Sequence, residues 1–165
     1  MKTGLLIGQL DDGGNQSALI RTAEAFGINN VFAVKDRDTY IHSTVSRGSE
    51  KHVTVEEFES YSDFVFHCYD NNYSIVSIEN TPDAEPIERK VDYPTNPIFV
   101  VGNESEGVPE GVMRHTDTVV KISQSPNSYI RCLNTTVSGS IVMHDWYDSM
   151  MSEDKTQKYE IEAGD

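Results

Sequence analysis

The feature that most constrains the fold is a continuous apolar run at residues 97–102, Pro-Ile-Phe-Val-Val-Gly. Four apolar residues between a proline and a glycine are typical of a strand that is buried on both faces, and such strands occur in parallel sheets. Other short apolar runs recur along the chain, and most are separated by stretches of helical periodicity. This alternation predicts an α/β fold with a mostly parallel sheet and helices on both of its faces.

Each expected element can be assigned a residue range. We expect strands at 2–10, 30–34, 52–55, 74–78, 97–102 and 118–122, helices at 15–26, 56–69, 109–115 and 133–150, a short helix or turn at 44–51 and a loop at 82–97. Asn15 suits the N-cap of the first helix, and Gly27 suits the position that ends it.

Composition is that of a single globular domain. The chain has 165 residues, a length that is enough to bury a core. Of these residues 37% are hydrophobic and 24% are charged, as is usual in globular proteins. We expect one domain over residues 1–150 and a polar, frayed tail over 151–165. No apolar run reaches the roughly 18 residues of a membrane span, and the first residues do not resemble a signal peptide. Two cysteines form neither a disulfide framework nor a metal cage. We therefore expect a cytoplasmic protein that binds no membrane and no metal ion.

The charge balance argues against a strongly basic surface. There are 13 Lys and Arg against 27 Asp and Glu, a net charge of −14, whereas phosphate binding relies on basic residues. The acid is unevenly spread, because residues 52–99 carry −8 and residues 21–51 carry +1. A segregated charge distribution can still present a positive face.

The polar clusters of the chain do not match common catalytic motifs. No G-x-G-x-x-G, P-loop or G-x-S-x-G is present, and the five histidines have no metal-ligand spacing. The clusters instead follow predicted strands, which is where α/β sheets bind ligands. Three such segments remain as candidate sites, at residues 14–27, 101–109 and 122–134.

Each segment has a structural as well as a functional explanation. Arg21 lies near the positive end of a helix dipole, which suggests an anionic partner, but it can also pair with Glu24. The loop after Val101 contains two glycines and two acids that either approach a ligand or simply connect a strand to a helix. The third segment offers helix N-terminal N–H groups to an anion, unless Asn127 or Asn134 caps the helix.

Taken in order, the three segments resemble the motifs of the SpoU–TrmH family of RNA 2′-O-ribose methyltransferases, in the SPOUT superfamily. The family motif N-x-x-A-x-x-R-T-A-x-A-F-G is similar to residues 15–27, G-N-E-x-E-G-[LV] to residues 102–108, and I-P-x-(loop)-S-L-N-V-S-x-A to residues 122–138. Residues 46–51 also resemble a family segment. The resemblance covers roughly residues 3–148.

The resemblance implies a fold, a cofactor and an assembly. Members of this superfamily thread their C-terminal segment into a trefoil knot, whose three loops form a pocket for S-adenosylmethionine. They work as homodimers, so we expect the final helix to supply part of an interface, with Leu133, Val137, Ile141 and Trp146 available for it.

The resemblance also implies roles for individual residues. The implied catalytic residues are Arg21, Asn15, Glu104 and Asn134. The implied cofactor-binding residues are Gly102, Asn103, Gly107, Ile122, Leu133 and Asn134. The implied RNA-binding residues are Arg21, Arg47, Lys51 and Arg131. Because an arginine rarely gives up its proton, Arg21 suits an electrostatic clamp on the developing alkoxide better than a general base.

The expected function is therefore methyl transfer from S-adenosylmethionine to a ribose 2′-hydroxyl of RNA. Transfer RNA is favoured over ribosomal RNA, because the first motif resembles the branch that modifies the D-loop guanosine. The sequence departs from the family at Cys132, where serine is usual, and at Ser123, where proline is usual. Cys132 and the acidic charge motivate an alternative, a catalytically weak module that binds cofactor or RNA.

Overall fold

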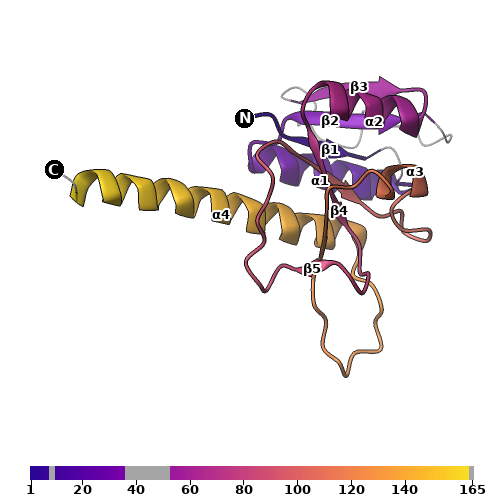
Figure 1. The fold of residues 1–165 in the computed structure, drawn as a ribbon. Coiled ribbons are helices and arrows are strands. Elements are labelled where there is room, and N and C mark those ends of the chain that lie inside the picture. Colours follow the sequence, from indigo (N-terminus) through magenta and orange to yellow (C-terminus); the bar gives the residue numbers. More distant parts are fainter. Residues whose placement is uncertain (8–9, 36–52, 164–165) are drawn as a thin grey trace.

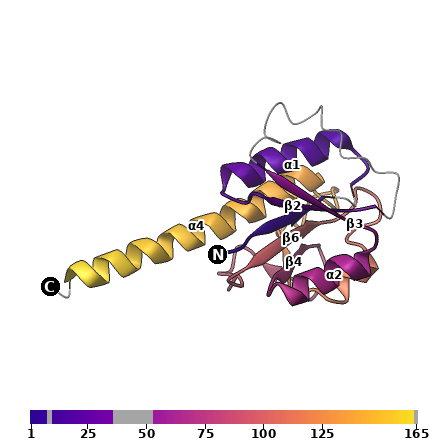
Figure 2. The same ribbon diagram turned by 90° about the horizontal axis from the view of Figure 1, so that it is seen from above.

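A parallel β-sheet forms the centre of the molecule, with helices on both of its faces (Figures 1 and 2). The structure is a computed structural model that describes residues 1–7, 10–35 and 53–163. The turn expected at 44–51, with Arg47 and Lys51, lies outside the described residues. The elements are β1 (Gly4–Leu6), α1 (Gly13–Ala25), β2 (Asn30–Val34), β3 (Thr54–Phe58), α2 (Tyr61–Asp70), β4 (Ser74–Ile78), β5 (Glu85–Pro86), β6 (Pro97–Val101), α3 (Glu110–Met113), β7 (Thr118–Lys121) and α4 (Thr135–Ala163).

The sheet follows the order β3-β2-β1-β6-β4-β7-β5, and within the described ranges all of its strand pairs are parallel. The apolar strand β6 lies between β1 and β4, and all five of its residues are buried. Phe99 of β6 lies opposite Leu5 of β1 on one side and Val76 of β4 on the other. The predicted α/β class and the buried parallel strand are therefore confirmed.

Two hydrophobic clusters form because alternate side chains of each strand point to opposite faces of the sheet. On one face, Leu5 and Phe99 pack with Leu19 of α1 and Met143 of α4. On the other face, strand residues that include Leu6 pack with α2 and α3 through Phe64 and Val112. Helices therefore cover both faces, as predicted.

Helix α1 begins one turn earlier than expected. Asp12 is its N-cap, and the Asp12 carboxylate accepts the Asn15 backbone N–H at 2.9 Å. The prediction that Asn15 is the N-cap is therefore wrong, because Asp12 occupies that position and Asn15 already lies inside the helix. Asn15 instead lies in the first turn, where its side chain can reach other segments. Gly27 follows the end of the helix with a φ of 79°, as predicted.

Strand β3 occupies residues that were expected to start a helix at Glu56. Phe58 lies opposite Val34 in the sheet register. Charged side chains fit here because β3 is an edge strand, and Glu56 and Glu57 are exposed. Helix α2 starts only after Ser60, whose hydroxyl accepts the Asp63 backbone N–H at 3.1 Å.

Residues 79–96 connect β4 to β6 by a path around the edge of the sheet. Within the expected loop, the two-residue strand β5 pairs with β7, so that Glu85 lies opposite Val120. The segment then reaches α4, where the Tyr93 hydroxyl donates to Asp145 Oδ2 at 2.6 Å. This connection therefore contacts both the last strand and the last helix.

Helix α4 is longer than expected and extends away from the body of the molecule (Figures 1 and 2). It continues to Ala163, beyond the end expected at residue 150, while the domain limits and the frayed character of residues 151–165 remain predictions. Trp146 is 4% exposed and its ring lies 5.6 Å from that of Phe99, so it belongs to the core and not to an interface. Val137 and Ile141 are exposed, as expected. No helix in the described part of the chain is both long and apolar enough to span a membrane.

Candidate active site

Three segments that are far apart in the sequence meet at Asn15. The Asn15 side-chain amide donates through Nδ2 to Glu104 Oε1 at 2.9 Å. Its Oδ1 accepts the Thr136 hydroxyl at 2.8 Å and lies 3.5 Å from Asn134 Nδ2. The fold thus brings together three of the four predicted catalytic residues, Asn15, Glu104 and Asn134, and adds Thr136.

Glu104 ties the loop after β6 to the start of α1. Besides the Asn15 amide, its carboxylate accepts the backbone N–H groups of Asp11 and Asp12, at 3.2 and 3.3 Å. These donors precede the first turn of α1, where the helix dipole favours a negative charge. The alternative that the acids of this loop simply connect a strand to a helix is therefore too narrow for Glu104.

Asn103 gives the same loop its shape. Its side chain is 6% exposed, and Nδ2 donates to Asp11 Oδ2 at 2.9 Å. Its Oδ1 accepts the backbone N–H groups of Ser105 and Glu106, at 2.9 and 3.0 Å. Asn103 and Gly107 also exchange backbone hydrogen bonds of 2.8 and 3.1 Å. Because the buried Asn103 side chain bonds to Asp11, Ser105 and Glu106, it fixes the conformation of the loop.

The glycines of this loop are required by close contacts. A Cβ on Gly102 would lie 3.0 Å from Gly107 Cα and 3.2 Å from Val108 N, both rigid backbone atoms. Gly107 has a φ of 76°, which side-chain-bearing residues rarely adopt. The Gly102 carbonyl accepts the Thr135 hydroxyl at 3.0 Å, which attaches the loop to the start of α4.

Asn134 is the residue that precedes α4, and it caps this helix. Its Oδ1 accepts the backbone N–H groups of Thr136 and Val137, at 2.8 and 3.3 Å. Of the alternatives left open for the third segment, capping by Asn134 is confirmed, and its Nδ2 in addition faces Asn15. Asn127 lies in the preceding loop and does not cap α4.

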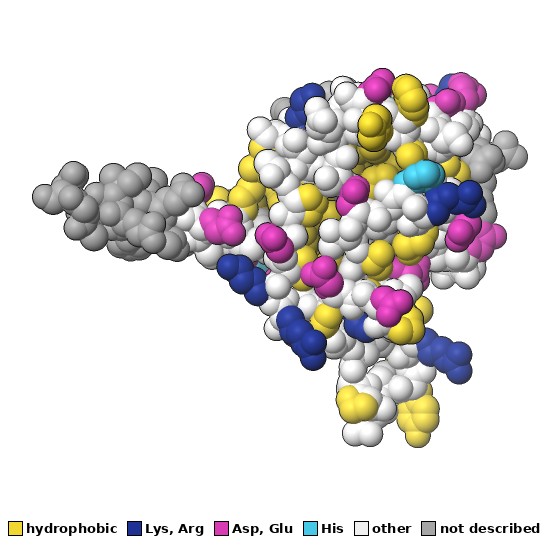
Figure 3. All heavy atoms as spheres, in the orientation of Figure 1, with side chains coloured by type: hydrophobic (Ala, Val, Ile, Leu, Met, Phe, Trp, Pro, Cys, Tyr) yellow, Lys and Arg dark blue, Asp and Glu magenta, His cyan; other side chains and the backbone are white. Residues whose placement is uncertain are grey.

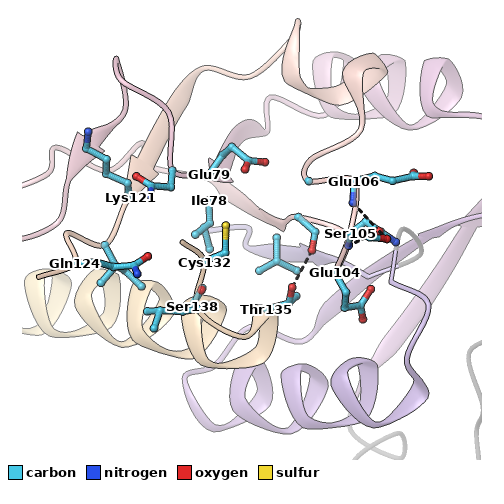
Figure 4. A pocket seen from close by; sticks show the side chains of 17 residues that line it. Ile78, Glu79, Glu104, Ser105, Glu106, Lys121, Gln124, Cys132, Thr135 and Ser138 are labelled. Atoms are coloured by element: carbon cyan, nitrogen blue, oxygen red, sulfur yellow. Dashed lines mark hydrogen bonds between the residues drawn. The ribbon is translucent and has the colours of Figure 1, made fainter. Parts of the chain in front are cut away.

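A pocket of about 340 Å³ opens between the loop after β6 and the segment that leads into α4 (Figure 4). The predicted residues that line it are Gly102, Asn103, Glu104, Gly107, Ile122 and Leu133. The lining residues that were not predicted as site residues include Glu79, Asn80, Lys121, Gln124, Cys132 and Thr135. Asn134 does not line the pocket itself but lies between two residues that do. The predicted cofactor residues therefore share one cavity with this single exception.

Glu79 is a pocket residue that the sequence could have identified. It directly follows β4, and its Oε2 accepts the Val108 backbone N–H at 2.8 Å beside Gly107. The rule that ligand-binding residues follow parallel strands applies to this position as well. Thr135 and Thr136 had no such signal, because hydroxyl residues at a helix start are common and their partners are distant in sequence.

Ser123, which stands where the family usually has proline, uses its backbone N–H. This N–H donates to Glu88 Oε1 at 2.8 Å, a hydrogen bond that proline cannot make. Desolvation by burial opposes ionisation of Glu88, but hydrogen bonds from its own backbone and from Ser123 outweigh it and lower the Glu88 pKa. With serine at this position, the chain loses the restricted φ of a proline and gains a hydrogen bond that links the third segment to residues 79–96.

Of the four predicted RNA-binding residues, Arg21 and Arg131 lie within the described part of the chain. Arg21 is exposed on α1, does not line the pocket and makes no ion pair with Glu24, so the structural explanation for it is not supported. Arg131 is exposed, and its carbonyl accepts the Asn80 side-chain amide at 3.4 Å. The structure therefore leaves both arginines facing solvent.

The cysteines differ in environment. Cys68 is a buried residue of α2, and burial raises the pKa of its thiol to about 12. Cys132 is exposed and lines the pocket. Within residues 1–7, 10–35 and 53–163, no group of three or more His, Cys, Asp or Glu side chains could hold a metal ion.

The sequence profile of the SpoU rRNA Methylase family matches residues 3–144. The chain belongs to this family. It is 26% identical over 148 residues to a TrmH family tRNA/rRNA methyltransferase of Staphylococcus saprophyticus, and 25% identical over 150 residues to one of Staphylococcus aureus. Each match covers 88% of this chain but 58% of the relative, so the chain spans little more than half the length of these proteins.

Solved structures share the fold of this SpoU-family chain. The TrmH/SpoU tRNA modifying enzyme of A. aeolicus superposes with a TM-score of 0.77 at 21% identity, covering 92% of this chain and 76% of that one. The SpoU methyltransferase AviRb of Streptomyces viridochromogenes, solved with the cofactor AdoMet, gives 0.78 at 19% identity over 90% and 60% of the two chains. A protein described for 2-OH methylation of C/U34 on tRNA gives 0.75 at 18% identity over 92% and 97%.

Proposed function

We propose that this protein is an S-adenosylmethionine-dependent methyltransferase that acts in the cytoplasm on a ribose 2′-hydroxyl of RNA. The observation that carries the proposal is the junction at Asn15, which joins the three family segments beside one pocket. Membership of the SpoU family supports the same reaction. Transfer RNA, and within it the D-loop guanosine, is the favoured substrate because of the first segment.

The pocket fits S-adenosylmethionine in size and chemistry. Its volume of about 340 Å³ is within the range of small-molecule sites. Because Gly102 has no side chain, its backbone approaches that of Gly107 closely, and the two form a backbone cradle in the pocket wall. The carboxylates of Glu79, Glu104 and Glu106 lie in the lining and suit a ligand with cationic groups. Gly102, Ile122 and Leu133 would hold the cofactor, which supplies an electrophilic methyl group when bound.

Residues at the rim of the pocket and on α1 act on the ribose side. Asn15 and Glu104 form a fixed pair at the rim and position the incoming ribose. Arg21 faces solvent on the same helix as Asn15, so it is accessible to an RNA oxygen from outside. A guanidinium in that place stabilises the negative charge that develops on the attacking 2′-oxygen. The cofactor loops and the ribose-side residues thus divide the task between different segments.

A C-terminal trefoil knot is part of the proposal. Residues 79–96 bond to the outer side of β7 and then to Asp145 of α4. Residues 122–134 contribute to the pocket wall and lead into α4. If this segment is threaded through the connection 79–96, the chain follows the knotted path that the family resemblance implies.

A homodimer is also proposed. Val137 and Ile141 are apolar, exposed and separated by one turn on α4, so they lie on the same side of the helix. Burying two such side chains against a second copy would remove apolar surface from water. Leu133 is half-buried and lies at the pocket, so it contributes less to this surface than expected.

Two alternatives have observations in their favour. Ribosomal RNA as substrate is supported by the name of the matching family and by relatives that carry both substrates in their names. A weak enzyme or binding module is supported by Cys132, because a thiol in the pocket wall forms weaker hydrogen bonds than the usual serine.

One experiment tests the proposal and separates these alternatives. The protein is incubated with total RNA and S-adenosylmethionine carrying a tritiated methyl group, and the 2′-O-methylated nucleotides are then mapped. Methyl groups at defined nucleotides of tRNA are expected. Labelling of rRNA would select the first alternative, and binding of cofactor or RNA without transfer would select the second.

A further inference from the structure

The loop between β7 and α4, residues 122–134, presents two large side chains, Tyr129 and Ile130, to solvent. It projects from the body as the orange segment in Figure 1. Tyr129 is 101% exposed and Ile130 is 63% exposed. In Figure 3, yellow side chains stand at the tip of this projection. Exposed apolar groups gathered at the end of a loop are typical of a contact surface.

Hydrogen bonds within the loop hold this tip in place. Gln124 Nε2 donates to the Ile130 carbonyl at 2.8 Å, and the Ile130 backbone N–H donates to Ser128 Oγ at 3.1 Å. The Ser128 backbone N–H donates to the Ser125 carbonyl at 3.0 Å. The backbone of the loop is therefore closed on itself, and Tyr129 extends from it into solvent. A loop backbone that is already ordered loses little entropy when it binds a partner.

The same loop forms one wall of the candidate active site. Ile122, Gln124, Cys132 and Leu133 line the pocket, so both ends of the loop belong to it. A ribose at the pocket mouth would lie beside the loop. The nucleotides next to that ribose are then the groups closest to the exposed tip.

Basic side chains around the base of the loop suit contact with the phosphates of RNA. Arg131 is exposed next to the tip, and Arg89 and Lys90 are exposed on the segment that Ser123 tethers through Glu88. Lys121 ends β7 at the start of the loop. Dark blue side chains lie around this base in Figure 3. These four cations lie in a chain with a net charge of −14, beside exposed acids that include Glu85 and Glu88, and the RNA backbone is the anionic partner that the proposed function brings to this loop.

We infer that Tyr129 stacks on an unpaired nucleobase that neighbours the methylated nucleotide, while Arg131 contacts the RNA backbone. The inference rests on the proposed function. Sequence-specific RNA sites are mostly single-stranded, with bases that splay out and stack on aromatic side chains. Such stacking accepts any base, so Tyr129 contributes affinity and position rather than base identity.

Photo-crosslinking tests the contact without relying on catalysis. The protein is irradiated with total tRNA at 254 nm, digested with trypsin and analysed by mass spectrometry. Trypsin cuts after Lys121 and Arg131, so one peptide, residues 122–131, carries Tyr129. A nucleotide adduct on this peptide is expected. Tyr69 on α2 is the internal control, because it is 81% exposed but lies on the opposite face of the sheet from α1 and α4. Adducts on the Tyr69 peptide alone would overturn the inference.

Variants give the second readout. Tyr129→Ala should raise the KM for RNA about tenfold, equivalent to ~1.4 kcal/mol at 25 °C, and leave the Kd for S-adenosylmethionine unchanged. Tyr129→Phe and the control Tyr69→Ala should stay within about twofold of wild type, because a phenylalanine ring still stacks. A Tyr129→Ala protein with the wild-type KM for RNA would overturn the inference. A Tyr129→Ala protein that becomes a monomer would also overturn it, because the loop would then contact a second copy of the chain. If the wild-type protein crosslinks to RNA without methylating it, the proposed function fails while this contact stands.

Discussion

Asn15 illustrates how much one side chain can join. Its amide donates to Glu104 and accepts from Thr136, so it needs both functions of the amide group. Aspartate would accept from Thr136 but would bring a second negative charge to within 2.9 Å of Glu104. The contact among the three segments therefore depends on an asparagine at this position.

Gly102 provides a test of the pocket at the scale of one residue. Gly102→Ala should weaken S-adenosylmethionine binding at least tenfold, because the new Cβ would lie 3.0 Å from Gly107 Cα and would push apart the loop that forms the cradle. Calorimetry of cofactor binding measures this change. Gly27→Ala is the matched control, since no atom lies within 4 Å of its added Cβ and only its φ of 79° opposes the substitution. The control should lose about 1 kcal/mol of stability and keep its affinity, and equal affinities in the two variants would contradict the cradle.

The two cysteines should differ in reactivity. At pH 8, a thiol reagent should label Cys132 quickly and Cys68 only on unfolding, because Cys68 is buried with a pKa of about 12. Saturating S-adenosylmethionine should slow the labelling of Cys132, since that residue lines the pocket. Mass spectrometry of the labelled peptides provides the rates. Unchanged labelling of Cys132 in the presence of bound cofactor would mean that the cofactor occupies another site.

At the scale of elements, the sequence predicted most strands and fewer of the boundaries. The run at 97–101 was identifiable because burial on both faces leaves no polar residue. β5 could not be predicted, because Glu85 and Pro86 form a strand only through pairing with β7. The end of β3 was misassigned, because its exposed glutamates at an edge strand resemble those of a helix.

The candidate site was predicted to a similar extent. Glu104, Gly102 and Asn134 were identified through motifs that belong to each segment separately. The hydroxyls of Thr135 and Thr136 were not, because their roles consist of contacts to Gly102 and Asn15 that only the folded chain creates. Local sequence carries no signal for such long-range pairs.

The hydrogen bond between Tyr93 and Asp145 fastens the connection 79–96 to α4, and it gives an element-scale prediction. Burial, followed by the Asp145 hydrogen bond, raises the Tyr93 pKa above its ordinary value of about 10. Tyr93→Phe should lower the free energy of unfolding by about 1 kcal/mol at pH 7.

The pH dependence of this effect has a definite sign. A raised folded-state pKa stabilises the native state fully below the unfolded pKa, and this contribution is lost as pH rises beyond about 10. The difference between wild type and Tyr93→Phe should therefore shrink in urea unfolding at pH 10.5 relative to pH 7. A difference that grows with pH would show that the hydroxyl is not held in its neutral form.

At the scale of the whole molecule, the exposed face of α4 predicts assembly. Sedimentation at tens of micromolar should give twice the chain mass of 18.5 kDa. Ile141→Asp should convert the dimer to a monomer, because it buries a charge in the proposed apolar contact. Phe66→Asp is the control, as Phe66 is 65% exposed on α2 and outside that contact. A wild-type monomer, or a dimer that only Phe66→Asp disrupts, would contradict this interface.

The central claim is that the second and third segments hold the cofactor while the first segment acts on the RNA. Arg21 separates these tasks, because it lies on α1 with Asn15 but outside the pocket. The most direct measurement compares single-turnover methyl transfer and S-adenosylmethionine affinity in wild type, Arg21→Ala and Arg21→Lys. We predict a loss of transfer rate of about 10²-fold or more for Arg21→Ala, ~2.7 kcal/mol of barrier, with nearly the same loss for lysine because it lacks the planar fork. The cofactor Kd should not change. A folded Arg21→Ala protein that transfers methyl groups at the wild-type rate would contradict the claim.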